Sequence, residues 1–306
     1  MEKRLTVLDE RNIWHGPMIA AARARGYEAQ RIERGYECDP EGLGFIRPHA
    51  VPRILEQNVL DFVTMRERVT MVQDLAQMEV YEDKSAQFWR WREFMPLTWR
   101  FENKNEACDF INSYKGPLVS KADVGASSYN VRVLHTTGGQ LNHAQAIFSR
   151  GVPVNHCAGG PGGRKVTSIQ RGYILLQEWI PHEITWRVNV IGRGCHAIFK
   201  RYNAPGTETC QTGNVEGVVE LDEAALGAAA KALQIADAVG SKWIAIDLLR
   251  KPNGRFYMLE TSLAWPWPSP GNCMEAQFFG PTTRKWAGIW DLMLDEYEAG
   301  AWSSAS

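Results

Sequence analysis

The stretch KWIAIDLLRKPNGRFYMLETSLAWPWPSP, residues 242–270, has the pattern of two apolar β-strands joined by a tight turn at Asn253-Gly254. Asn and Gly adopt the positive φ angles that such a turn requires more readily than other residues do. A turn centred on this pair places Asp247 directly opposite Glu260. The sequence therefore predicts a β-hairpin in which two acids face each other in the middle of apolar strands.

These two acids need a compensating positive charge. Opposed side chains on one face of a sheet have Cβ atoms roughly 4.5–5.5 Å apart, and like charges at that spacing are destabilising. Ala245, Leu249 and Met258 are expected on the same face, so apolar side chains would keep water from the pair. A shared proton, a Lys or Arg from elsewhere, or a divalent cation such as Mg²⁺ would relieve the repulsion. The alternative is a solvated sheet face with two unrelated acids.

Composition excludes several classes of protein. The chain has 306 residues, with 34 basic and 35 acidic side chains and no long block of either sign, so nothing indicates a nucleic-acid partner. Its 6 cysteines show no CxxC spacing, and His156-Cys157 matches no common zinc pattern. The first residues lack the apolar core of a signal peptide, and no run approaches the roughly 18 apolar residues of a membrane helix. We expect a soluble, cytoplasmic protein.

Three units follow one another along the chain. Residues 1–80 alternate strand and helix like a small α/β domain, but they lack the Gly-x-Gly-x-x-Gly turn of a dinucleotide-binding fold. Residues 81–175 begin with a Trp-rich helix and continue as strands around a loop of small residues. Residues 176–306 contain further strands, an Ala-rich helix that ends at Gly240, the hairpin, and a last helix whose apolar face would include Trp286 and Trp290.

Two further stretches suit a nucleotide. Lys121 ends the apolar strand PLVSK and precedes ADVGASS, and backbone N–H groups of such a loop can hold phosphate oxygens; the alternative is a surface Lys beside a turn. In LLQEWI, residues 175–180, a strand ends beside an apolar slot of the kind an adenine ring requires. GGPGGRK, residues 159–165, is not a P-loop, because Arg164 separates Gly163 from Lys165.

The order of these pieces resembles the ATP-grasp superfamily. The Asp83-Lys84 pair, Lys121 with its loop, LLQEWI, TWRVNVIG and AIDLL…FYMLETS follow one another over residues 81–270. The branch they resemble contains the ribosomal-protein glutamate ligases and the peptide-maturing ATP-grasp ligases. The resemblance implies two α+β lobes that clasp ATP behind a small α/β N-terminal domain, with two Mg²⁺ ions. It also implies a carboxylate–amine ligase that works through an acyl phosphate and releases ADP and phosphate, in a family where homodimers are common.

The resemblance also implies roles for individual residues. The nucleotide would be held by Lys84 and Lys121 at its phosphates, by a covering loop with Gly125, Ser127 and Ser128, by Gln177, Glu178 and Ile180 at the adenine, and by Glu183 and Asn214. Arg187 and either Lys200 or Arg201 would act on the transferring phosphoryl group, and Asp247, Glu260 and Ser262 would hold the metal.

Two positions depart from the family pattern. The metal strand reads Glu260-Thr261-Ser262 where the family has Glu-x-Asn, and Thr185 stands where the family has an acid. These departures leave open a nucleotide-binding module without catalysis, and a carboxylate kinase is a third reading. For the substrate, which would be a small-molecule or peptide carboxylate with an amine, the candidates are Arg47, His49 and Arg53, or their loop merely turns the chain.

Overall fold

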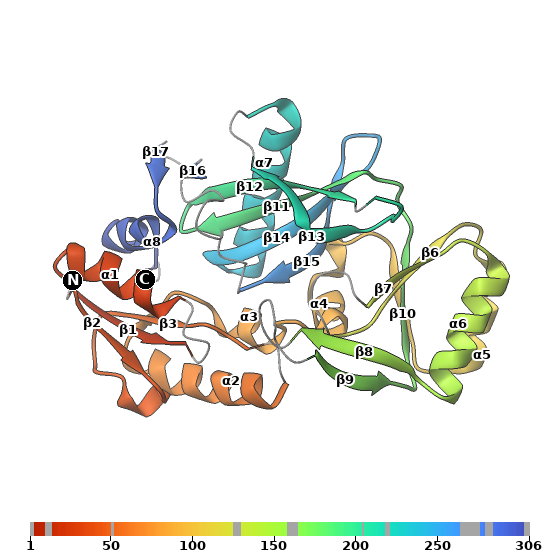
Figure 1. Ribbon diagram of the computed structural model, residues 1–306, viewed down its shortest axis with the longest axis horizontal. Helices are drawn as coiled ribbons and strands as arrows, with labels where there is room; N and C mark the ends of the chain where they lie inside the picture. Colours follow the sequence, from red (N-terminus) through yellow and green to blue (C-terminus); the bar gives the residue numbers. More distant parts are fainter. Residues whose placement is uncertain are drawn as a thin grey trace.

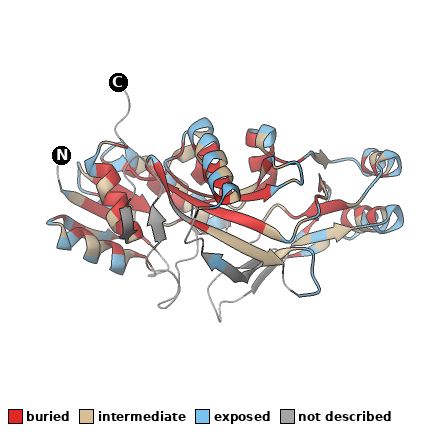
Figure 2. Ribbon diagram, turned by 90° about the horizontal axis from the view of Figure 1, so that it is seen from above, coloured by how far each residue is buried: buried red, intermediate tan, exposed pale blue. Residues whose placement is uncertain are grey.

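A computed structural model describes residues 3–9, 14–49, 52–124, 130–157, 165–203, 205–217, 221–263, 276–278 and 284–302. The three largest of the five sheets in the described residues lie along the long axis of the molecule, and the sheet built last in the sequence lies between the other two (Figure 1). Buried residues run along these sheets, and exposed residues lie on the outward sides of the helices at both ends of the molecule (Figure 2). No helix in the described part of the chain combines the length and apolar character needed to cross a membrane.

The N-terminal sheet is parallel and has the order β2-β1-β3-β4. Parallel neighbours require crossover connections, which the helices of this unit supply. The elements are β1 (Arg4–Leu8), α1 (His15–Ala24), β2 (Glu28–Ile32), the 3₁₀ turn η1 (Gly35–Glu37), β3 (Leu43–Ile46), α2 (Pro52–Arg66), β4 (Thr70–Met71) and α3 (Leu75–Glu79).

The sheet formed by the middle part of the chain is antiparallel, has the order β5-β10-β6-β7 and lies at the opposite end of the molecule from the N-terminal sheet (Figure 1). Helices α5 and α6 share a small apolar core with it, built around Ile111, Leu118, Ile147 and Leu176. Strand β10, which the expected boundary between residues 175 and 176 would divide, lies wholly in this sheet. The elements are α4 (Lys84–Trp91), η2 (Arg92–Phe94), β5 (Thr98–Phe101), α5 (Lys104–Ser113), β6 (Leu118–Lys121), β7 (Val131–Leu134), α6 (Thr137–Ser149), the hairpin β8 (Val152–Cys157) and β9 (Lys165–Gln170), and β10 (Ile174–Glu178).

The third sheet is antiparallel, with the order β13-β12-β11-β14-β15, and α7 covers one of its faces. The Ala-rich helix forms as expected: Asp222 caps its first turn by accepting from Ala225 N, and Gly240 ends it at φ 72°. The elements are β11 (Ile184–Ile191), β12 (Gly194–Asn203), β13 (Cys210–Gly217), α7 (Glu223–Val239), β14 (Trp243–Arg250), β15 (Phe256–Ser262), β16 (Ala276–Phe278), β17 (Arg284–Ala287) and α8 (Ile289–Glu298).

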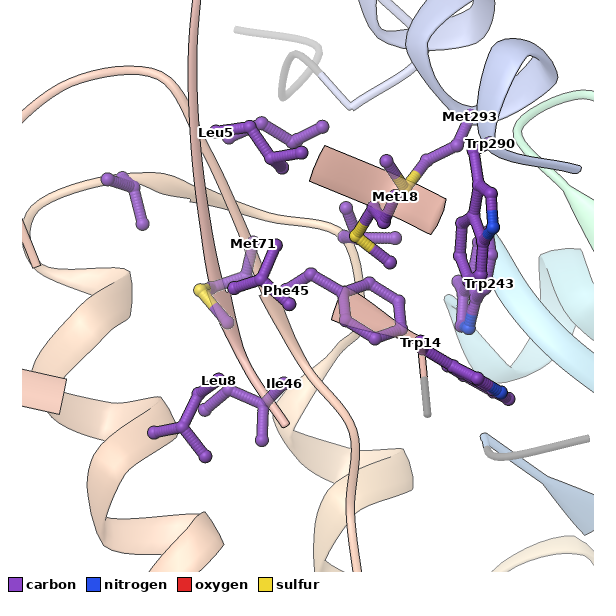
Figure 3. Packing of buried hydrophobic residues seen from close by; sticks show 14 of the residues in the cluster. Leu5, Leu8, Trp14, Met18, Phe45, Ile46, Met71, Trp243, Trp290 and Met293 are labelled. Carbon is purple, nitrogen blue, oxygen red and sulfur yellow. The ribbon is translucent and has the colours of Figure 1, made fainter. Parts of the chain in front are cut away.

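The last helix packs against the N-terminal unit. Helix α8 begins at Ile289, so Trp286 belongs to β17 and the expected helical face is one turn shorter. Trp290 of α8 packs in the N-terminal core with Trp14, Phe45 and Trp243 (Figure 3). The N-terminal unit and the third sheet therefore share one apolar core.

Candidate nucleotide-binding site

The hairpin β14–β15 pairs Asp247 with Glu260, as predicted. Its turn differs from the prediction. Gly254 N donates to Lys251 O, so Pro252 and Asn253 are the central residues, and Gly254 follows them at φ 85°. Pro favours the first central position of such a turn because its ring presets φ.

A β-bulge at Leu259 restores the pairing that the turn would otherwise shift. Leu248 pairs with Met258, whereas Asp247 pairs with Glu260, so Leu259 has no partner of its own in the ladder. Leu259 and Glu260 consequently line the same pocket. Met258 packs instead in the core under α7, which corrects its expected place beside the acids.

Two arginines supply the positive charge that the buried Asp247 requires. Arg187 Nε donates to Asp247 Oδ1 at 2.6 Å, and Arg187 Nη2 donates to Oδ2 at 2.8 Å. Arg201 Nη1 donates to the same Oδ2 at 2.9 Å. Burial raises the pKa of Asp247, but the two guanidinium groups outweigh it and lower the pKa to about 2. Asp247 is therefore a carboxylate at any ordinary pH.

Two lysines stand beside Glu260. Lys84, the first residue of α4, has its Nζ 3.5 Å from Glu260 Oε2. Lys121, at the end of β6, donates to the carbonyl of the bulge residue Leu259 at 3.5 Å. Burial lowers the pKa of Lys121 to about 8, although Glu260 opposes the shift. A buried ammonium with a lowered pKa gains from any anion that enters the pocket.

One pocket gathers these groups from both antiparallel sheets. The hinge segment Glu178–Trp179–Ile180 contributes to its wall, as do Val119, Leu249 and Leu259, which form an apolar slot. Eight of the residues expected from the sequence line it: Lys84, Lys121, Gln177, Glu178, Ile180, Arg201, Asp247 and Glu260. An apolar slot that ends in a cluster of cations suits a ligand with a flat ring and a polyanionic tail.

The side chains of the hinge are engaged in holding the strand. Gln177 Nε2 donates to Thr98 Oγ1 at 2.8 Å, and Glu178 Oε1 accepts from Leu97 N and Lys251 Nζ, each at 3.0 Å. His182 Nδ1 lies 2.7 Å from the Ile180 carbonyl oxygen, and burial lowers the pKa of His182, which favours the neutral imidazole as donor. Because these side chains are already hydrogen-bonded, a base bound here would have to hydrogen-bond the remaining backbone groups of the hinge.

Solved structures with a similar arrangement of elements include two ATP-grasp proteins and a D-cycloserine synthetase. The RimK-domain ATP-grasp protein from Sphaerobacter thermophilus has 16% identity and a TM-score of 0.54, and the match covers 85% of this chain and 91% of that one. D-cycloserine synthetase DcsG has 12% identity, a TM-score of 0.62 and coverage of 97% and 99%. The ATP-grasp ligase PsnB, complexed with a minimal precursor, Mg and ADP, has 12% identity, a TM-score of 0.62 and coverage of 98% of both chains.

The chain has the ATP-grasp fold. The fold expected from the order of the motifs is thereby confirmed. No family model matches the sequence, and a comparison with curated proteins finds no match.

The ATP-grasp fold does not bring every expected residue to the pocket. Lys200 lies on the opposite face of β12 from Arg201, with its Nζ 5.3 Å from the Trp186 ring and 3.6 Å from Asp222. Of the two alternatives, the strand pleat thus selects Arg201. Glu183 is exposed and Ser262 is buried opposite Ala245, and neither lines the pocket.

The three substrate candidates lie in the N-terminal unit. Arg47 stacks over the Trp14 ring at 4.9 Å, and its Nη1 is 3.9 Å from Asp9 Oδ1. His49 N donates to Asn58 Oδ1, and Arg53 is exposed on α2. Gly125, Ser127 and Ser128 lie outside the described residues, as does the side chain of Asn214 in β13.

Sequence reasoning missed part of the pocket wall. Cys210, the first residue of β13, and Thr209 just before it line the pocket together with Arg201, and no motif marks them. Thr185 and Leu249 also line it, because each lies two residues from a charged residue on the same strand face. Leu249 was expected beside the acids, whereas Thr185 was noted only as a departure from the family pattern.

The donor atoms at this pocket would fit Mg²⁺ held jointly with a polyphosphate. Asp247 Oδ1 accepts one hydrogen bond and each carboxylate oxygen has two lone pairs, so it retains a position for a cation. In the described part of the chain, no three His, Cys, Asp or Glu side chains group closely enough to hold a metal. Mg²⁺ commonly takes one or two carboxylates and completes its shell with phosphate oxygens and water.

Proposed function

We propose that this protein is an ATP-dependent ligase that joins a carboxylate to an amine through an acyl phosphate and releases ADP and phosphate. The observation that carries the proposal is the cluster of Lys84, Lys121, Arg187 and Arg201 around two opposed carboxylates at the end of an apolar slot. Phosphoryl transfer depends on positioning and on cations that neutralise charge on the phosphate oxygens. The ATP-grasp neighbours support the nucleotide, since one is complexed with Mg and ADP.

In this proposal the two lysines hold the nucleotide's phosphates. The adenine occupies the slot between Val119 and Leu249 and hydrogen-bonds the backbone near Ile180. Gly125, Ser127 and Ser128 remain the proposed covering loop. Because the two ammonium groups lie in one pocket, their mutual repulsion is relieved when the phosphates bind.

Asp247 and Glu260 are the proposed ligands of Mg²⁺, which would neutralise the charge that develops on the transferring phosphoryl group. Arg187 and Arg201 hold Asp247 in place and keep it ionised. The Arg201 side chain also lines the pocket, whereas Arg187 acts through its two hydrogen bonds to Asp247.

The proposed reaction has two steps, and each bond that forms is matched by one that breaks. A substrate carboxylate oxygen attacks the γ-phosphorus, the bond to the β-phosphate oxygen breaks, and ADP leaves. The amine then attacks the acyl carbon, loses a proton, and displaces inorganic phosphate as the amide forms. The first step leaves negative charge on the oxygens of ADP, and the second develops it on the carbonyl oxygen and then on the departing phosphate, which is why a cationic site assists both.

A peptide or a small-molecule carboxylate is the proposed substrate class. PsnB was solved with a precursor peptide and DcsG is a D-cycloserine synthetase, so ligases of this fold serve both kinds of substrate. Arg47, His49 and Arg53 remain the proposed substrate contacts, and Arg47 is the best prepared because Trp14 already holds its guanidinium.

Thermal melting with a non-hydrolysable ATP analogue tests the site first. Ligand that binds only the native state raises its stability by RT ln(1 + [L]/Kd), so wild-type protein should melt at a higher temperature with analogue and Mg²⁺ together. The double variant Asp247→Asn, Glu260→Gln should lose the Mg²⁺-dependent part of this increase. A screen of carboxylates and amines for ADP release then tests the ligase.

Two results would contradict the proposal. Nucleotide binding without ADP release for any carboxylate and amine would indicate a nucleotide-binding module without catalysis. Full ADP release by the double variant would show that the two acids do not hold the metal.

A further inference from the structure

Helix α4 contacts the strand that carries Glu260 through a second side chain besides Lys84. Gln87, one helical turn after Lys84, is only 1% exposed. Its Oε1 accepts from Thr261 N at 2.9 Å, and its Nε2 donates to Thr261 O at 3.2 Å. One side-chain amide therefore pairs with both backbone groups of a single residue of β15.

Strand β15 needs such a partner because it is the last strand of its sheet. Thr261 faces Ile246 of β14 on one side, and its N–H and C=O point to the other, where no strand of the described residues follows. Thr261 is 5% exposed, so water does not satisfy these groups, and a buried unpaired backbone group is costly. Gln87 takes the place of a neighbouring strand.

The amide itself is held firmly. Gln87 Nε2 also donates to the Val80 carbonyl at 3.2 Å. The Thr261 hydroxyl donates to Gln77 Oε1 at 3.3 Å, so a second buried amide contacts the same residue, but only through its side chain. The backbone position of Thr261 is thereby set by α4 rather than by its own sheet alone.

Helix α4 is also hydrogen-bonded to the segment that follows β6. Lys84 N donates to Asp123 O at 2.9 Å, and Ser85 Oγ donates to Asp123 Oδ1 at 2.5 Å. Asp123 follows Lys121 by two residues at the end of β6. Helix α4 is thus bonded through Lys84 and Ser85 to the segment that follows Lys121, and through Gln87 to the strand that carries Glu260.

We propose that Gln87 is a positioning residue for the Mg²⁺–nucleotide site, because its clamp on Thr261 holds Glu260 opposite Asp247 and within reach of Lys84. The inference rests on the proposed function, since it assigns Glu260 to the metal. Gln87 does not line the pocket and acts only through the strand.

The test compares nucleotide affinity with and without Mg²⁺ by calorimetry. Gln87→Met keeps the length and unbranched shape of the side chain and removes both the donor and the acceptor. Outer-shell partners of metal ligands typically contribute about 10- to 100-fold to metal affinity, so we expect a loss of this size for the analogue with Mg²⁺. Affinity for the analogue in a chelator should change less than about twofold, since Lys84 and Lys121 remain.

Gln77→Met is the matched control. It removes an equally buried amide that contacts the Thr261 hydroxyl but not its backbone. We expect its Mg²⁺-dependent affinity to stay near that of the wild type. Amide exchange of Thr261, followed by NMR, supplies an independent measurement: Gln87→Met should lose protection there, and Gln77→Met should keep it.

The outcomes separate the inference from the function it rests on. Wild-type protein that binds the analogue with Mg²⁺, together with a folded Gln87→Met variant of equal Mg²⁺-dependent affinity, overturns the inference and leaves the function standing. Wild-type protein without Mg²⁺-dependent binding overturns the function. If Gln87→Met does not fold, Gln87→Glu, which keeps an acceptor for Thr261 N, undergoes the same comparison, and unchanged Mg²⁺ dependence there overturns the inference.

Discussion

Asp247 is an acid whose charge is already balanced before any ligand binds. Three hydrogen bonds from Arg187 and Arg201 fill most of its acceptor positions. Charge-assisted hydrogen bonds of this kind are the strong ones, and removing one partner leaves a buried charge undercompensated. The arginines thus keep the pKa of Asp247 low in a pocket where burial acts to raise it.

Arg201 and Lys200 provide a matched pair of substitutions on adjacent residues. Arg201→Met removes a charge-assisted hydrogen bond to Asp247, worth about 1.5–3 kcal/mol, and should weaken Mg²⁺-dependent nucleotide binding roughly tenfold to a hundredfold. Lys200→Met removes a cation on the other face of the strand and should change this binding less than about twofold. Calorimetric titration of both variants makes the comparison; equal losses would contradict the placement of the site on one face of β12.

Lys121, as a proposed phosphate contact, should make nucleotide affinity depend on pH. Its ammonium in the unliganded protein loses its proton as the pH rises through about 8, because burial lowers the pKa. Phosphate oxygens stabilise the charged form, so affinity should be full below that pH and fall by up to about tenfold per unit above it. Binding above pH 8 should also take up a proton, which titrations in two buffers of different ionisation enthalpy measure.

Lys121→Arg is the control for this pH dependence, since a guanidinium stays charged throughout the range. The nucleotide affinity of this variant should not change between pH 7 and pH 9.5. A wild-type affinity that is equally flat would show that Lys121 does not contact the nucleotide.

At the scale of elements, the turn and the bulge of the β14–β15 hairpin act together. The three-residue turn displaces the register by one position, and the extra residue Leu259 displaces it back. The predicted pairing of Asp247 with Glu260 is therefore confirmed, whereas the predicted position of the turn and the predicted face of Met258 are wrong. A turn motif reports local φ preferences, whereas a bulge depends on what the sheet packs against.

The same Gly-to-Ala substitution at Gly254 and at a helical glycine tests the geometry of this turn. Gly254→Ala puts a Cβ at φ 85° and should destabilise the protein by about 1 kcal/mol. Gly138→Ala lies in α6, where a new Cβ meets no atom within 4 Å, and should stabilise the protein by up to about 1 kcal/mol. Urea unfolding of both variants measures the change in unfolding free energy, which should have opposite sign in the two. A stabilising effect of Gly254→Ala would contradict the positive φ of Gly254 in this turn.

At the scale of the whole molecule, α8 joins the third sheet to the N-terminal unit. Trp290 stacks on Trp243 with a centroid distance of 5.9 Å and an interplanar angle of 13°. Arg25 of the N-terminal unit donates to Asp295 at 2.6 Å and to Glu298 at 2.8 Å. On its other side α8 accepts from Arg193, since Glu296 Oε2 receives both Arg193 N and Nε at 3.0 Å.

Trp290→Ala should therefore cost about 3–5 kcal/mol of unfolding free energy, the usual effect of removing a large buried aromatic side chain. Trp89→Ala is the control, because Trp89 is 59% exposed and surface substitutions usually change stability by less than about 0.5 kcal/mol. Denaturant unfolding followed by circular dichroism measures both. Similar midpoints for the two variants would contradict a shared core.

The sequence by itself determined what depends on neighbours along the chain. The pairing of Asp247 with Glu260, the cap and stop of α7, and the ordered motifs that resemble ATP-grasp proteins follow from turn, capping and spacing preferences that act over a few residues. The tertiary structure alone decided what depends on distant segments. Arg187 and Arg201 reach Asp247 across 60 and 46 residues of sequence, and Gln87 reaches Thr261 across 174. Such contacts form only when the sheets have packed, because their geometry is set by the pleat and by the core rather than by any local preference.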